Sequence, residues 1–102
     1  MAQLTIIKGT TDAVTAKTEV NLVGYESGNL IANLLAGAEE ADIFVNSAGT
    51  WMTLVDKDGN VQKLTATKYA LVLEGGSLYA VTKDATVGAC AITVDLGRGI
   101  NA

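Results

Sequence analysis

Residues 50–65 read TWMTLVDKDGNVQKLT, and this stretch gives the clearest structural signal in the chain. Two runs of strand-forming residues, 50–55 and 61–65, flank a turn segment at 56–60. The Asp56 side chain can cap a type I turn, and Gly59 can take the left-handed backbone conformation that closes such a loop with a bulge. The stretch therefore predicts a β-hairpin, which a valine at position 59 would strain.

The segments downstream continue the same pattern. Residues 69–73 and 78–82 flank 75–77, Gly-Gly-Ser, which predicts a second short connection of hairpin type. In segment 89–96 every second residue is apolar, which predicts a strand with one face toward a core. Those apolar positions are Cys90, Ile92, Val94 and Leu96.

Three upstream segments, 4–7, 20–23 and 42–45, are further strand candidates. Their spacing is typical of a sandwich or barrel. We therefore expect an all-β fold, an antiparallel β-sandwich of jelly-roll type with about eight strands.

Segment 29–37 (NLIANLLAG) fits two structures. Its leucines and isoleucine match a helical stripe that Ser27 could cap, so a short helix near residues 29–36 is one alternative. A strand fits nearly as well, and the segment is short and lies between strands. We favour the strand.

The composition indicates one folded domain spanning residues 1–102. Apolar residues make up 49% of the chain and charged residues 18%, a balance that buries a core and argues against disorder. There is no proline, and eleven glycines fall mostly between apolar runs. Glycine, asparagine, aspartate and serine must therefore provide the turns.

The charge pattern excludes some partners. The net charge is −4 and the seven basic residues are scattered, so no positive patch is available for nucleic acid. No apolar run reaches the roughly 18 residues of a membrane helix, and the first residues do not resemble a signal peptide. We expect no membrane partner and a protein made and kept soluble in a cytoplasm.

Cys90, the one cysteine, is expected to be a buried thiol.

The sequence offers little catalytic chemistry. It has no histidine, which removes the commonest general base and most zinc sites. The densest acidic cluster, Glu39, Glu40 and Asp42, is expected to be a solvated turn. An enzyme that uses carboxylates alone is the remaining catalytic alternative. We predict that the protein is not an enzyme and needs no cofactor.

Asp56, Asp58 and Asn60 have the spacing that opens a calcium-binding loop. Such a loop wants glycine at its sixth position and glutamate at its twelfth, where this chain has Val61 and Thr67. The turn interpretation explains the segment better, and no metal site is predicted.

Two features could contact other molecules. Trp51, with the three tyrosines, could form a carbohydrate platform, although a single tryptophan more often anchors a small β core. The C-terminal segment 97–102, which contains Arg98 and Ile100, has no periodicity. We interpret it as either a docking arm or a frayed tail.

Residues 48–67 resemble a stretch of small bacteriophage virion structural proteins. In that group a Gly-Thr-Trp strand precedes an Asp-Gly hairpin, a Leu-Thr-Ala strand and a segment like 73–81 (LEGGSLYAV). The resemblance covers roughly residues 43 to 96.

The resemblance implies a capsid cement or decoration protein. Such a protein would lie on the virion surface after synthesis in the host cytoplasm, bind the major capsid protein, stabilise the shell and often form a homotrimer. No catalytic residue carries over. The alternative function is a ligand- or glycan-binding module of a phage fibre or spike.

Overall fold

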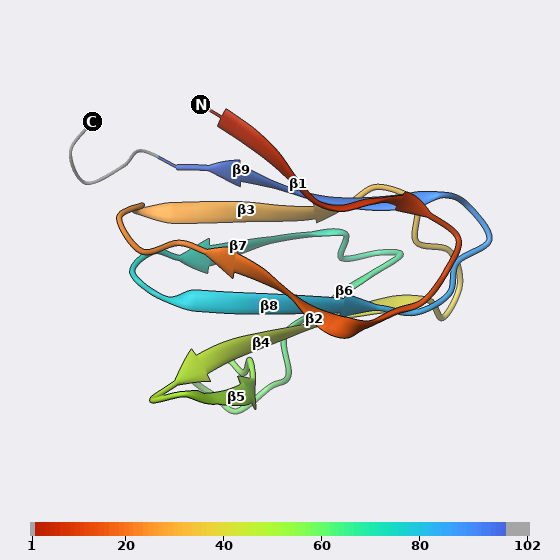
Figure 1. Ribbon diagram of the computed structural model, residues 1–102. Coiled ribbons are helices and arrows are strands. Elements are labelled where there is room, and N and C mark those ends of the chain that lie inside the picture. The colour runs from red at the N-terminus through yellow and green to blue at the C-terminus, as the bar shows by residue number, and fades with distance from the viewer. Residues whose placement is uncertain (1, 98–102) are drawn as a thin grey trace.

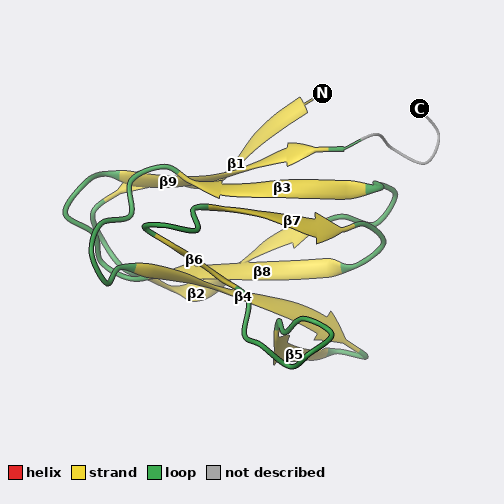
Figure 2. Ribbon diagram, turned by 180° about the vertical axis from the view of Figure 1, so that it is seen from behind, coloured by secondary structure: helices red, strands yellow, loops and turns green. Residues whose placement is uncertain are grey.

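The computed structural model describes residues 2–97, which fold as two packed antiparallel sheets with no helix among those residues (Figures 1 and 2). The predicted all-β sandwich is confirmed. The nine strands are β1 (Ala2–Thr10), β2 (Val14–Asn21), β3 (Ser27–Ala32), β4 (Glu40–Ser47), β5 (Thr50–Thr53), β6 (Lys63–Thr65), β7 (Ala70–Glu74), β8 (Leu78–Lys83) and β9 (Cys90–Leu96).

One sheet has the strand order β1-β9-β3-β7, and the other has the order β2-β8-β4-β5, with β6 also paired to β4. The chain ends are tied together because β1 pairs with β9, with Ala2 opposite Leu96. Between the sheets lies a core of aliphatic side chains with Tyr79 and the predicted buried thiol of Cys90. Its largest fully buried members are Leu22, Leu30, Ile43, Leu64, Leu73 and Ile92.

The segment at 29–36 is a strand in its first half and a loop in its second. In β3, Gly28, Leu30 and Ala32 face the core, and the helix alternative is wrong. A Cβ at Gly28 would lie 2.9 Å from a methyl carbon of Val94, so β3 packs closely against β9 at this glycine. Leu34 lies in the loop that follows β3.

The stretch that predicted a hairpin forms a more unusual element. β5 and β6 do not pair with each other, because both pair with β4, at Phe44–Ser47 and at Glu40–Asp42. The strand opposite β4 is thus interrupted by residues 54–62, here called the excursion. A hydrogen bond from Gln62 N to Leu54 O (2.9 Å) and a bridge between Val55 and Val61 close its base. The predicted hairpin exists only as this small excursion.

The second predicted hairpin is wrong. β7 and β8 belong to different sheets, so residues 75–77 cross from one sheet to the other. The crossing packs on the turn between β2 and β3, where Gly76 N donates to Leu22 O at 2.8 Å. A Cβ at Gly75 would overlap the backbone carbonyl of Tyr25, so only glycine fits there. The candidate strand at 20–23 also shifts, since β2 ends at Asn21.

The loops gather at two ends of the sandwich (Figure 1). The start of β1, the end of β9 and the turns before β3, β5 and β8 lie at one end. The loops after β1, β3 and β8, which are residues 11–13, 33–39 and 84–89, lie together at the other, here called the loop end (Figure 2).

Candidate functional site

The predicted turn residues Asp56 and Gly59 shape the excursion. Gly59 has a left-handed backbone with φ of +84°, and Asp56 Oδ1 accepts hydrogen bonds from the backbone N–H groups of Asp58 (2.8 Å) and Asn60 (2.9 Å). The bond from Asn60 is the main cause that lowers the pKa of Asp56. No group of three metal-ligating side chains occurs among residues 2–97. The Asp56 carboxylate therefore stabilises the turn through these hydrogen bonds.

Trp51 and the tyrosines occupy separate positions. Trp51 is half-buried on β5, opposite Asn46, and the core is built without it. The core-anchor interpretation of Trp51 is therefore not supported. Tyr79 is a core residue whose hydroxyl donates to Glu74 O at 2.8 Å, and burial raises its pKa. A buried, bonded Tyr79 cannot join an exposed aromatic platform.

The C-terminal segment can be placed only at its first residue. Gly97 N donates to Ser27 O at 2.8 Å, which fixes the end of β9 beside the start of β3. Arg98 and Ile100, the predicted docking residues, lie outside the described residues.

The acidic cluster holds loops together at the loop end. Glu39 accepts hydrogen bonds from Ala36 N (2.9 Å) through one carboxylate oxygen and from Val87 N (3.0 Å) through the other. The loops after β3 and β8 are therefore joined by one side chain. Glu39 precedes β4, whereas Glu40 and Asp42 lie within it, so the expected turn is wrong for these two. Glu39 and Glu40 are partly exposed and Asp42 is exposed.

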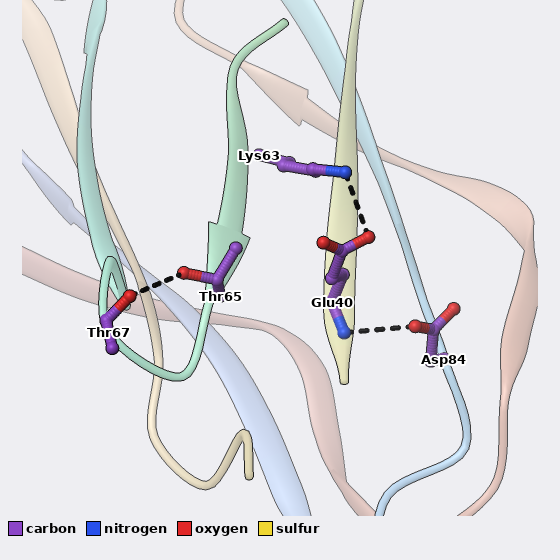
Figure 3. Close-up of polar contacts among 5 residues, drawn as sticks. All are labelled: Glu40, Lys63, Thr65, Thr67 and Asp84. Carbon is purple, nitrogen blue, oxygen red and sulfur yellow. Dashed lines mark hydrogen bonds and ion pairs between the residues drawn. The ribbon is translucent and has the colours of Figure 1, made fainter. Parts of the chain in front are cut away.

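Glu40 continues this connection toward β6 (Figure 3). Its carboxylate forms an ion pair with Lys63 Nζ at 3.0 Å, and its backbone N–H donates to an Asp84 carboxylate oxygen at 3.0 Å. Asp84 N returns a bond to Glu40 O at 3.0 Å. The hydrogen bond to Glu40 is the main cause that raises the pKa of Lys63.

Lys83 and Thr86 form a second, buried network at the loop end. The Lys83 ammonium group is almost fully enclosed and donates to Asp84 O (3.0 Å) and Thr86 Oγ1 (3.2 Å). Thr86 in turn bonds Gly88 O through its hydroxyl (2.6 Å) and Thr11 O through its backbone N–H (2.9 Å). A buried ammonium group needs such partners, so the network fixes the loop after β8.

Sequence reasoning missed this network, although a signal for it exists. Lys83 lies two residues beyond Val81 and four beyond Tyr79, on the inward face of β8 by strand alternation.

The loops after β3 and β8, which Glu39 joins, expose two apolar side chains to solvent. Val87 is 87% exposed, the highest value among the exposed large hydrophobic residues, and Leu34 is 50% exposed. Leu34 lies against Gly88, where a Cβ would be 3.3 Å from the Leu34 Cβ. We call Leu34 and Val87 the apolar tip. Both side chains are carried by loops that the hydrogen bonds of Glu39 join.

An open groove of about 490 Å³ lies between the excursion and β7. Its lining is both apolar and polar: Leu54, Val55, Leu71, Val72, Leu73 and Tyr79 with Asp56, Lys57, Gln62 and Glu74.

Comparison of the chain with protein-family models, with curated proteins and with solved structures gives no match. In the part of the chain that the structure describes, no helix is long and apolar enough to cross a membrane.

Proposed function

We propose that this protein is a non-enzymatic virion structural protein, a capsid decoration or cement protein that binds the major capsid protein and stabilises the shell. The resemblance of residues 43 to 96 to small phage structural proteins suggests this class. The apolar tip carries the proposal, because it is an exposed apolar surface on a support that is already rigid.

Rigidity favours binding because a surface that is already ordered loses little conformational entropy when a partner covers it. Hydrogen bonds of Glu39, Lys83 and Thr86 join the loops after β1, β3 and β8, and these bonds fix the loops that carry the apolar tip. Val87 can therefore enter a pocket on the partner without a costly rearrangement.

A capsid shell is a partner to which a protein can bind firmly even when each contact area is small. A shell presents many identical sites, so modest contacts act together when the bound protein joins neighbouring subunits. A rigid β-sandwich that touches two subunits resists their separation.

The test is binding to shells assembled without this protein from the major capsid protein of the same phage. We expect the wild type to bind and to raise the melting temperature of the shells. Val87→Asp should weaken binding at least tenfold, because it places a charge in an apolar contact. Val23→Asp is the matched control, since Val23 is 62% exposed in the turn after β2, at the opposite end of the sandwich.

If the wild type neither binds the shells nor changes their melting, the proposed function is wrong. If Val87→Asp and Val23→Asp bind as well as the wild type, a surface other than the apolar tip makes the contact.

A further inference from the structure

The edge strands of the two sheets are protected unequally. β1 has two register shifts in its pairing with β9, and β2 has one in its pairing with β8 and carries Lys17 within it. β5 and β6 have only four and three residues. Bulges, lysines and short length all prevent a sheet edge from pairing with another chain.

β7 has neither a register shift nor a lysine, and its one charged residue, Glu74, lies at its end. It pairs with β3 over five consecutive residues, ALVLE. It is the last strand of its sheet, so one long side is unpaired within the described residues. Val72, at its centre, is 66% exposed.

Hydrogen bonds at both ends of β7 show which backbone groups face outward. Ala32 N donates to Tyr69 O (2.9 Å), and Gly75 N donates to Glu26 O (2.8 Å). In an antiparallel pair the groups of alternate residues point to the partner, so the odd-numbered residues from 69 to 75 bond to β3. Ala70, Val72 and Glu74 therefore direct their backbone groups away from the sheet.

We propose that β7 pairs antiparallel with β7 of a second copy of this chain, across a two-fold axis at Val72. Val72 would lie opposite Val72 of the second copy, and Ala70 opposite Glu74. This register pairs all three outward-facing residues and forms about six hydrogen bonds. Shifted registers pair fewer of them.

Charge favours this antiparallel arrangement. Lys68 precedes β7 and Glu74 ends it, so antiparallel pairing brings the positive end of one strand to the negative end of the other. Parallel pairing would place like charges together. An isologous contact is also the commonest form of homo-oligomer.

The groove gives the pairing an apolar component. Leu71 and Leu73 line the groove from β7, and in this register Leu71 of one copy lies opposite Leu73 of the other. The leucines of the second copy would extend this apolar lining across the axis. Glu74 O already accepts the Tyr79 hydroxyl, and a carbonyl oxygen has a second lone pair for the bond from the partner strand.

Substitution at Val72 tests the pairing by removing one backbone donor. Val72→Pro deletes an N–H that points away from β3, so the ladder of the monomer keeps its bonds. Val72→Thr is the matched control, because it keeps the N–H and a β-branched side chain. We expect light scattering at up to about 1 mM chain to give twice the chain mass of 10.5 kDa for the wild type and Val72→Thr. Val72→Pro should give the mass of one chain, with circular dichroism unchanged.

A cysteine at position 72 provides a test that does not depend on the proline variant folding. Hydrogen-bonded antiparallel residues have Cα atoms about 5.5 Å apart, which a disulfide can span. Val72→Cys should therefore form a covalent dimer rapidly under mild oxidation, while the native Cys90 is fully buried. Val23→Cys, with similar exposure at another site, should crosslink at least tenfold more slowly.

A wild type that remains one chain at about 1 mM would overturn the proposal, as would crosslinking of Val72→Cys no faster than that of Val23→Cys. A trimer whose mass is unchanged by Val72→Pro would do the same, and would favour the three-fold assembly that the resemblance implies. These measurements use no shells, so they are independent of the proposed capsid binding.

Discussion

Gly59 tests how far one residue determines the shape of the excursion. Its φ is +84° and no atom lies within 4 Å of the point that a Cβ would occupy, so the cost of a side chain is set by the backbone and not by crowding. Gly59→Ala should lower the free energy of unfolding by about 1 kcal/mol, and Gly59→Val by more. Urea denaturation measures the free energy of unfolding of each variant. The exposed neighbour Lys57, changed to alanine, should have an effect within about 0.5 kcal/mol. Equal effects at both positions would contradict the prediction.

Ionisation of Asp56 makes the stability of the fold depend on pH. Because its pKa in the folded protein is below the ordinary value of 3.8, the ionised form stabilises the fold above that value. This stabilisation is lost as the pH falls through the folded pKa. Asp56→Asn should therefore be less stable than the wild type near neutral pH, with a difference that shrinks on acidification.

Urea denaturation of both proteins between about pH 2 and pH 7 measures this difference. A difference that stays constant across that range would show that the charge of Asp56 is unimportant.

At the scale of elements, one carboxylate joins the two loops that carry the apolar tip. Glu39→Ala removes the acceptors of Ala36 N and Val87 N. Hydrogen bonds to a charged group are worth about 1.5 to 3 kcal/mol when buried and less at a half-exposed site. We expect amide hydrogen exchange at Thr86 and Val87 to become about tenfold faster, while exchange in β9 stays unchanged.

Glu39→Gln is the control for this prediction, because its side-chain oxygen can still accept one of the two bonds. Its effect should lie between those of the wild type and Glu39→Ala. Unchanged exchange at Thr86 and Val87 in Glu39→Ala would show that the buried Lys83 network alone holds the loop.

Several elements follow from the sequence alone, and others do not. The alternation in β9 is confirmed, since Cys90, Ile92, Val94 and Leu96 are all buried. The turn chemistry of Asp56 and Gly59 is also found where it was expected. The prediction failed where residues 75–77 connect the two sheets, because a glycine-rich link between strands has the same local sequence in a hairpin and in a crossing.

At the scale of the whole molecule, the fold closes only when its two ends meet. β9 lies between β1 and β3, so the sheet is incomplete until nearly the whole chain is present. Contacts so distant in sequence make folding slow, in the range of milliseconds to seconds. The chain contains no proline, so no phase of tens of seconds from proline isomerisation should follow.

Stopped-flow refolding, followed by the fluorescence of Trp51, checks this prediction. We expect one phase at low protein concentration, and any slower phase should depend on concentration because it reports association of copies. A slow phase that is independent of concentration would contradict the prediction.

Local sequence patterns are enough to predict that the chain forms strands, where most of them lie and which turn residues adopt special backbone conformations. These properties depend on residues within a few positions of one another. Three other properties emerge only from long-range packing: β5 and β6 share one edge of β4, β7 and β8 lie in different sheets, and Glu39, Lys83 and Thr86 meet at the loop end. Strand pairing joins residues far apart in the chain, and many pairings satisfy the same alternation of apolar side chains. Only the packing of both sheets around one core selects among them.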